Sequence, residues 1–299
     1  MPASTAMENY KAVDSFTTTR HSDTYPFISP QKADLSGKSV FVAGASKGIG
    51  RETALALAEA GCSKIGIGAR SDLSSLAEEI AKRATNSSKT APQVVSIHLD
   101  VTSEDSVQAA ADKIGQEFGG VLDVLICNSG RLERWVPVAE TTPVEWWRTY
   151  ETNVKGAYLL NRFFIPLLLK SEIRTSILVS SYGAIGMTPG GSGYQSSKFT
   201  LCRLAEFIAM EYAEQELVCF ALHPGAIKTE LARGLPESHW EILVDEPALP
   251  AHTLVWLSKE HRMWLSGRFV SVSWDMKELE SKKSQVVEGN LFKFRMVYE

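Results

Sequence analysis

The chain has no apolar run that approaches the roughly 20 residues needed by a membrane-spanning helix. Its most apolar run, FFIPLLL at 163–169, is short and is interrupted by Pro166. The first residues, MPASTAMENYKAVDSFTTTR, lack the apolar core of a signal peptide and contain Glu8 and Asp14, which are atypical of a transit peptide. The sequence therefore predicts a cytoplasmic protein with no membrane partner.

The chain also lacks an excess of positive charge and closely spaced cysteines. Its net charge is -4, whereas a general nucleic-acid binder usually has a basic face. The 4 cysteines are widely scattered, with no Cys-x-x-Cys motif and no ligand-like spacing to histidine. These absences argue against a nucleic-acid partner and a metal site, and they favour reduced thiols in a reducing compartment.

The sequence does have a regular alternation of short β-branched runs and longer helical stretches. The strand-like runs lie at 39–44, 64–69, 93–99, 121–127, 175–180, 217–223 and 268–274, and helical stretches include 48–60, 103–118, 143–170 and 194–215. Several strands are apolar on both faces, as strands covered by helices on two sides must be. This alternation predicts an α/β fold, a doubly wound parallel sheet of the Rossmann type in a single domain.

Composition divides the chain into three parts. We expect residues 37–275 to form the Rossmann-type domain. Residues 1–36 are polar and rich in Ser and Thr, and we expect them to form an arm outside the main core. Residues 276–299 form a charged C-terminal tail.

A glycine-rich turn, AGASKGIG at 43–50, directly follows the first predicted strand. Gly44, Gly48 and Gly50 let the chain turn tightly, approach a ligand closely and pack the next helix onto the sheet. The N–H groups at the start of that helix favour a pyrophosphate. A turn kept tight for packing alone is the alternative. Its place at the first strand-to-helix turn of an alternating chain favours a dinucleotide site.

Charge after the second strand predicts which dinucleotide binds. An NAD-binding protein usually has an acid there, which accepts a hydrogen bond from the ribose 2′-hydroxyl. Here GIGARSD at 66–72 has Arg70 at that position, and Lys47 lies in the glycine turn. Two cations beside the adenosine ribose favour a 2′-phosphate and therefore NADP(H), although Asp72 follows two residues after the arginine.

Tyr194 and Lys198 in GYQSSKF, at 193–199, are four residues apart. On a helix this spacing places both on one face. The spacing alone is unspecific, because Tyr158 and Arg162 share it. A neighbouring ammonium group favours the phenolate of a tyrosine whose free pKa is about 10, as suits proton transfer in carbonyl reduction. The surrounding motifs decide between catalysis and a plain surface contact.

The motifs together resemble those of the classical short-chain dehydrogenases/reductases across residues 37–275. In the family's order they are AGASKGIG (43–50), HLDVTS (98–103), CNSG (127–130), TNVKG (152–156), LVSSYGA (178–184), GYQSSK (193–198) and HPGAIKT (223–229). The chain departs from the family pattern in three places. Ala43 stands where Thr is usual, and only Asn128 and Gly130 of CNSG match Asn-Asn-Ala-Gly. The last strand continues as VSVSWDMKELE, where many members have Asp-Gly-Gly.

The resemblance implies a catalytic tetrad of Asn153, Ser181, Tyr194 and Lys198. Ser181 is preferred to Ser180 because it lies thirteen residues before Tyr194, the usual family interval. Tyr194 would transfer the proton, Lys198 would lower its pKa and hold the nicotinamide ribose, Ser181 would donate to the carbonyl oxygen, and Asn153 would hold a water. The implied cofactor contacts are Gly44, Ser46, Lys47, Gly48, Ile49, Gly50, Arg70, Asp100, Val101, Asn128, Gly130, Tyr194, Lys198, Ile227 and Thr229.

Two segments are expected to enclose the substrate, 131–147 and the family's mobile lid at 229–250. Trp135, Leu235 and Trp240 are available to cover an apolar ligand, and Arg131 and Arg134 are the available clamps for an anion. The segment IGMTPGG, at 185–191, is expected beside the nicotinamide. The substrate expected is a neutral, fairly apolar small molecule with a ketone or alcohol group.

The resemblance also implies assembly, since the helices at 154–170 and 194–215 commonly pack against their copies in a homodimer or homotetramer. Three functions stay open at this point. The first is an NADP(H)-dependent oxidoreductase acting on a carbonyl/alcohol pair, more as a reductase. The second is non-redox chemistry on the same scaffold, such as dehydration or cyclisation. The third is a non-catalytic NADP-binding sensor or scaffold. The complete tetrad favours the oxidoreductase.

Overall fold

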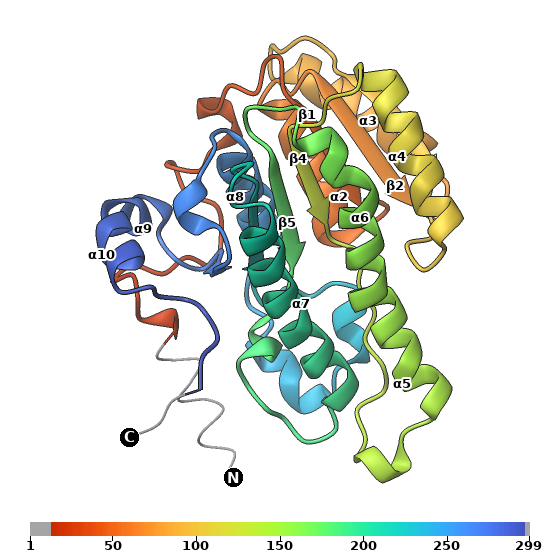
Figure 1. The fold of residues 1–299 in the computed structure, drawn as a ribbon, viewed down its shortest axis with the longest axis vertical. Coiled ribbons are helices and arrows are strands. Elements are labelled where there is room, and N and C mark those ends of the chain that lie inside the picture. Colours follow the sequence, from red (N-terminus) through yellow and green to blue (C-terminus); the bar gives the residue numbers. More distant parts are fainter. Residues whose placement is uncertain (1–12, 297–299) are drawn as a thin grey trace.

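A seven-stranded parallel sheet runs through the centre of the computed structural model, which describes residues 13–296 (Figure 1). Its order is β3-β2-β1-β4-β5-β6-β7. The strands are β1 (Ser39–Ala43), β2 (Lys64–Ala69), β3 (Gln93–His98), β4 (Val124–Cys127), β5 (Thr175–Val179), β6 (Val218–His223) and β7 (Phe269–Ser271). The chain winds outward from β1 in both directions, so the order reverses between β1 and β4. Ligands of open α/β sheets bind at such a point, beyond the carboxyl ends of the strands. The predicted doubly wound sheet is confirmed.

Helices cover both faces of the sheet, which explains why its central strands are apolar throughout. On one face lie α2 (Gly48–Glu59), α3 (Ser74–Asn86) and α8 (Ala248–Ser258), and on the other α4 (Glu104–Phe118), α6 (Gly156–Leu168) and α7 (Ser192–Glu211). Successive residues of β1 enter opposite cores, with Val40 and Val42 in one and Phe41 and Ala43 in the other. This follows from the alternation of side chains along a strand.

The stretch predicted as one helix over 143–170 is divided in the structure. It consists of α5 (Pro143–Tyr150), a π-helical turn (Glu151–Lys155) and α6 (Figure 1). Proline at the first position of α5 suits a helix start, because its missing N–H would have no partner there. The π turn inserts one extra residue into the helix and contains Asn153. Such turns are frequent at functional sites.

Short 3₁₀ turns occupy several of the connections between these elements. They are Pro30–Lys32, Val138–Glu140, Tyr182–Ala184, Leu231–Gly234, Glu237–Ile242 and Met263–Leu265. The charged tail contains two short helices, α9 (Met276–Ser281) and α10 (Lys283–Glu288). In the part of the chain that the structure describes, no helix is both long and apolar enough to cross a membrane.

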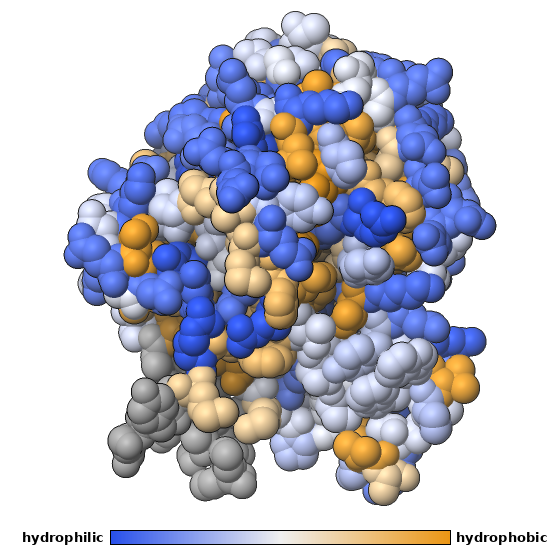
Figure 2. Space-filling view, viewed as in Figure 1, coloured by the Kyte–Doolittle hydropathy of each residue, from blue (hydrophilic) through white to orange (hydrophobic). Residues whose placement is uncertain are grey.

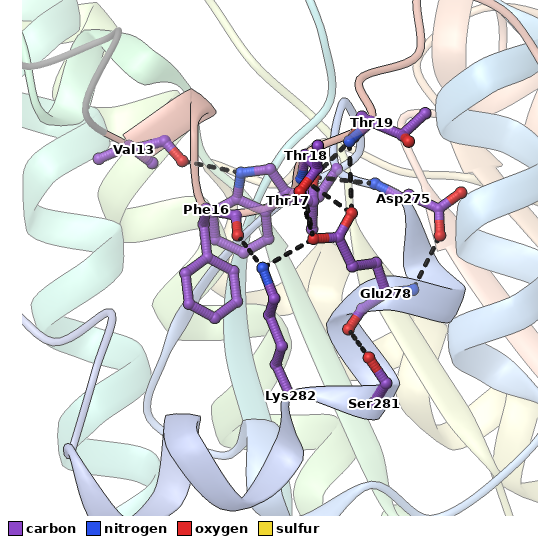
Figure 3. A network of polar contacts seen from close by, with 10 residues as sticks. Val13, Phe16, Thr17, Thr18, Thr19, Asp275, Glu278, Ser281 and Lys282 are labelled. Carbon is purple, nitrogen blue, oxygen red and sulfur yellow. Dashed lines mark hydrogen bonds and ion pairs between the residues drawn. The ribbon is translucent and has the colours of Figure 1, made fainter.

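The N-terminal arm and the tail lie side by side next to β7, and polar contacts join them (Figures 1 and 3). The Glu278 carboxylate accepts hydrogen bonds from the backbone N–H of Thr18, at 2.9 and 2.8 Å, and of Thr19, at 3.3 Å. Lys282 Nζ donates to the carbonyl oxygen of Phe16 at 2.6 Å. Trp274 Nε1 donates to the carbonyl oxygen of Val13 at 2.9 Å. The two ends of the chain thus form one layer.

The described part of the arm also enters the core. Ile28 and Leu35 are fully buried and belong to the same apolar cluster as β1 and α8. The expectation that the arm lies outside the main core is therefore corrected for residues 13–36. These two apolar side chains help to anchor it in the core. Residues 1–12 of the arm and 297–299 of the tail lie outside the described residues.

Candidate active site

The turn between β1 and α2 requires glycine at several positions, because the backbone conformation and the close packing leave no room for a side chain. Gly44 and Gly48 have φ angles of +88° and +56°, which favour glycine. A Cβ on Gly50 would lie 2.2 Å from the carbonyl oxygen of Gly44 and 2.6 Å from Asn128 Nδ2. Asn128 itself donates to that Gly44 oxygen at 2.8 Å, so it links the turn to the end of β4.

The start of α2 has the features of a phosphate site. No side chain caps the first N–H groups of the helix, which begins at Gly48. Free N–H groups and the positive end of the helix dipole favour an anion. Lys47, just before the helix, forms an exposed ion pair with Glu230 of the lid at 2.5 Å. Ser46 and Ile49 complete the turn. These residues fit the pyrophosphate of a nicotinamide dinucleotide.

The residues predicted around the adenosine lie after β2 and β3. Arg70 is exposed at the end of β2. Burial opposes ionisation of Asp100, but hydrogen bonds from Thr102 and the charges of Arg70 and His98 outweigh it, so its pKa lies below the usual value. A Cβ on Gly156 would lie 2.8 Å from a methyl carbon of Val101, so Val101 packs closely against that glycine. Arg70 therefore lies close enough to Asp100 for its charge to favour the ionised carboxylate.

The side chain of Asn153 is almost fully engaged by the protein. It is buried, and Oδ1 accepts from the backbone N–H of Arg131 at 2.7 Å. Nδ2 donates to the carbonyl oxygen of Arg131 and to Ser197 Oγ, both at 2.9 Å. Both amide hydrogens are thus used. A water held by this residue would bond to its backbone or to the remaining lone pair of Oδ1.

Lys198 is buried on α7, beside Asn153. Its Nζ donates to the carbonyl oxygen of Val179 at 2.8 Å. Burial lowers the pKa of Lys198 to about 8. A Cβ on Gly130 would lie 3.6 Å from Lys198 Nζ and 3.8 Å from Asn153 Oδ1, so both polar groups lie close to that glycine. The ammonium also lies 5.6 Å from the centroid of the Tyr194 ring.

Ser181 and Tyr194 line one small space near the end of β5. A Cβ on Gly183 would lie 3.3 Å from Ser181 Oγ and 3.5 Å from Tyr194 Cε1. Ser181 Oγ accepts from the backbone N–H of Gly183 at 3.0 Å. Ser180 instead is buried and donates to the carbonyl oxygen of Lys198 at 2.8 Å. The structure therefore brings the four tetrad residues together beyond β4 and β5, whereas the Ser180 hydroxyl is engaged by the backbone of α7.

A comparison with known proteins places this arrangement in a family. A family model described as short chain dehydrogenase matches residues 38–240. The chain belongs to the short-chain dehydrogenase/reductase family. This confirms the family predicted from the motifs. Members are generally oxidoreductases that bind a nicotinamide cofactor and act on small molecules.

Known members of the family are similar to the chain over most of its length. The short chain dehydrogenase mpl6 of Monascus purpureus is 46% identical over 277 residues, covering 93% of this chain and 94% of the relative. A solved alcohol dehydrogenase from the archaeon Thermococcus sibiricus, complexed with 5-hydroxy-NADP, is 26% identical with a TM-score of 0.67, covering 78% and 95%. A 3-ketoacyl-(acyl-carrier-protein) reductase of Brucella melitensis, complexed with NADH, shares the fold at 24% identity and a TM-score of 0.69, covering 80% and 98%.

In this family member, a tyrosine–histidine pair supports the strand ends below Ser181. Tyr182 N–H donates to His223 Nδ1 at 3.1 Å, and the two rings stack with centroids 3.7 Å apart. The phenol bonds to Ser271 Oγ at 2.8 Å and to Asp14 of the arm. Burial lowers the pKa of His223 to about 3, so the imidazole stays neutral and can accept. Sequence reasoning missed this pair, whose only signal is a tyrosine directly after Ser181.

The lid begins against the cofactor turn. A Cβ on Gly48 would lie 3.3 Å from the methyl carbon of Thr229, so Thr229 packs closely against the glycine turn. Ile227 is buried and forms an isolated parallel bridge with Asp245 at the far end of the lid. Both predicted nicotinamide-side residues thus connect the lid to the crevice, and Glu230, which forms the ion pair with Lys47, directly follows Thr229.

The segment after β4 packs between the lid and the start of α7. Trp135 lies against the backbone of Gly190 and Gly191 and has its ring 5.4 Å from that of His239 in the lid. Arg131 forms an ion pair with Glu145. Arg134 is exposed.

The other predicted lid residues lie nearer the surface. Trp240 is 43% exposed and donates through Nε1 to the carbonyl oxygen of Leu235 at 3.1 Å. In the segment after β4, Trp146 donates through Nε1 to Ser192 Oγ at 3.1 Å. Of the tryptophans in these segments, Trp135 is therefore the one joined to both the lid and α7.

A separate apolar hollow lies beside α5. Its volume is about 430 Å³, and it is lined by Val138, Thr141, Pro143, Trp146, Trp147 and Ser192. These residues include no titratable group and no member of the tetrad. The hollow therefore offers apolar contact but no acid–base chemistry. Among the described residues, no group of His, Cys, Asp and Glu could hold a metal ion.

Proposed function

We propose that the protein is an NADP(H)-dependent oxidoreductase that transfers hydride between the nicotinamide and a carbonyl/alcohol substrate, chiefly as a reductase of a fairly apolar ketone. One observation carries the proposal. A serine hydroxyl, a tyrosine and a buried lysine meet beyond the ends of β4 and β5, next to a glycine turn fit for a dinucleotide. This combination supplies what carbonyl reduction needs from the protein.

Each residue has a distinct part in this mechanism. The bound cofactor supplies hydride to the carbonyl carbon. Ser181 donates a hydrogen bond to the carbonyl oxygen and orients it. Tyr194 gives its proton to that oxygen as negative charge develops there. The Lys198 ammonium stabilises the phenolate that is left, because opposite charges at this range favour the ionised form. Asn153 fixes the backbone at Arg131 and so holds the loop opposite α7.

The preference for NADP(H) over NAD(H) is supported by charge. Arg70 occupies the position after β2 where an acid would accept from a ribose 2′-hydroxyl. The side chain of Arg70 cannot accept a hydrogen bond from the 2′-hydroxyl, but its guanidinium can bind a 2′-phosphate through paired N–H groups. Lys47 offers a second cation once it leaves Glu230.

The test is consumption of NADPH with a panel of aryl and alkyl ketones. The wild-type protein is expected to oxidise NADPH with at least one of them, and Tyr194→Phe to lose about 10²–10⁴-fold in rate while still binding NADPH. Lys198→Met should impair both rate and cofactor binding. Tyr158→Phe is the matched control, because Tyr158 has the same spacing to Arg162 and is exposed on α6. A Tyr194→Phe protein with undiminished turnover would refute the mechanism. NADPH binding without oxidation by any ketone would favour non-redox chemistry or a sensor.

A further inference from the structure

Glu133 is a buried carboxylate that the proposed mechanism does not use. Its residue is only 5% exposed, in the loop that follows β4. Oε1 accepts from the backbone N–H of Tyr194 at 2.8 Å. It therefore satisfies an early N–H group of α7, whose own N-cap residue, Gly191, provides no side-chain cap. A negative charge also suits the start of a helix.

The second oxygen of Glu133 has no hydrogen-bond partner among the described residues, although it is buried. A Cβ on Gly193 would lie 2.8 Å from Oε1 and 3.1 Å from Oε2, so the absence of a side chain there makes room for the whole carboxylate. Leaving a buried carboxylate oxygen without a donor costs free energy. A donor that binds next to Tyr194 would remove this cost.

A second buried polar atom without a partner among the described residues lies two positions along the same loop. It is Trp135 Nε1, on the ring that packs against Gly191. The lid covers this loop, because a Cβ on Gly234 would lie 2.8 Å from Leu132 and His239 contacts the Trp135 ring. An acceptor on Glu133 and a donor on Trp135 thus lie under the lid, both against the first turn of α7.

We propose that Glu133 is a specificity-determining residue whose Oε2 accepts a hydrogen bond from a hydroxyl group of the substrate while its Oε1 holds the backbone of Tyr194. The substrate class is therefore a ketone that carries an alcohol or phenol hydroxyl besides the reacting carbonyl. This inference rests on the proposed ketone reduction, but it concerns binding, which can be measured without turnover. The lid opens to admit the substrate and then covers both polar atoms with it.

The first test compares binding of matched aryl ketones to the protein in the presence of NADP⁺. The probes are the three ring isomers of hydroxyacetophenone and the three corresponding methoxyacetophenones, titrated calorimetrically. O-methylation removes the donor and keeps the oxygen. At least one hydroxy isomer should bind about 10-fold or more tightly than its methoxy counterpart, as expected for a hydrogen bond to a charged group. No preference for any hydroxy isomer, or no binding of any of them, would overturn the proposal.

The second test uses Glu133→Gln, in which the orientation of the amide is fixed by the structure. The Tyr194 N–H needs an acceptor, so the amide oxygen must take the place of Oε1 and the NH₂ group that of Oε2. The site then presents a donor. The hydroxy-over-methoxy preference is expected to fall to about 1 or to reverse. Glu140→Gln removes an exposed carboxylate from the same segment and should leave the preference unchanged.

The two tests separate the possible failures. A wild-type preference that persists in Glu133→Gln assigns the hydroxyl to another residue and overturns the proposal. Should Glu133→Gln fail to fold, judged by thermal unfolding, the wild-type comparison still decides, because methylation acts on the ligand alone. The wild type could also show no ketone reduction and still show a binding preference that depends on Glu133. That result would contradict the proposed function and support this inference.

Discussion

The ammonium group of Lys198 donates to the carbonyl oxygen of Val179 at 2.8 Å in the protein interior. Burial there lowers its pKa to about 8. The charged form, which supports Tyr194, is therefore lost as the pH rises through about 8. We expect kcat/KM for ketone reduction to fall with increasing pH above that value, since this constant reports groups of the free enzyme. A rate that stays level up to the usual pKa of lysine, about 10.4, would contradict this assignment.

Replacement of Arg70 with Asp should change cofactor choice. The acid repels a 2′-phosphate and can accept from a 2′-hydroxyl. Loss of one charge-assisted contact is expected to weaken NADPH binding about 10- to 100-fold, with NADH binding kept or improved. Fluorescence titration measures both constants. Arg134→Asp makes the same charge change at another exposed arginine and should leave both constants unaltered. Equal affinity of the wild type for the two cofactors would disprove the NADP(H) preference.

The burial of His223 should make the free energy of unfolding depend on pH. Its pKa falls from 6.5 to about 3 because burial disfavours the charged form. Below 6.5 the unfolded chain binds a proton that the folded chain does not, so the free energy of unfolding decreases as pH falls toward 3. The slope from this group approaches about 1.4 kcal/mol per pH unit. Urea unfolding across this range should show a smaller slope in His223→Asn, whose amide oxygen still accepts from Tyr182 N–H. An unchanged slope would exclude His223 as the source.

The link between arm and tail should depend on Glu278. The Lys282 ammonium and the N–H groups of Thr18 and Thr19 hold the pKa of this carboxyl at about 2. Its contribution is thus present above pH 4.5 and is lost as the pH falls below that value. Glu278→Ala is expected to lower the free energy of unfolding by about 1–3 kcal/mol and to expose the arm to limited proteolysis. Glu280→Ala, at an exposed position of the same helix, should do neither. Equal protease sensitivity of the two variants would argue against this role.

The exposed side of α6 and α7 should form a contact between two copies of the chain. Tyr158, Phe199, Phe207 and Met210 are 49%, 42%, 49% and 65% exposed there, and hydrophobic atoms gather over α7 in the middle of the face in Figure 2. Light scattering at micromolar concentration is expected to show an oligomer, and Phe207→Glu with Met210→Glu should yield a monomer. Val287→Glu, at an exposed apolar position of the tail, is the control. A monomeric wild type would disprove this contact.

The sequence predicted the sheet because most of its strands are short apolar runs, and it predicted the tetrad because short motifs carry it. Both signals are local. Val40 to Ala43 read as a buried strand in any context, and the turn at Gly44 follows from a glycine requirement of its own backbone. The interval between Ser181 and Tyr194 likewise lies within one strand–helix unit.

The features that the sequence did not predict depend on contacts between distant segments. Glu133 is an ordinary charged residue until α7 places Tyr194 beside it. The π turn at Asn153 leaves no signature in an otherwise helical stretch. Ile28 and Leu35 belong to a segment whose overall composition is polar, so composition alone assigned them to an exposed arm. In each case tertiary packing sets the environment, and local sequence cannot report it.

The bond between Thr18 and Glu278 joins residues 260 positions apart. A ribosome adding about 5–20 residues per second makes the first of them roughly 13–50 s before the second. Throughout that interval the N–H groups of Thr18 and Thr19 lack the Glu278 carboxylate. Asp14, which contacts Tyr182 directly after Ser181, belongs to the same arm. The layer that joins the arm to the tail is therefore among the last parts of the molecule to be completed during synthesis, because it needs Glu278 of α9.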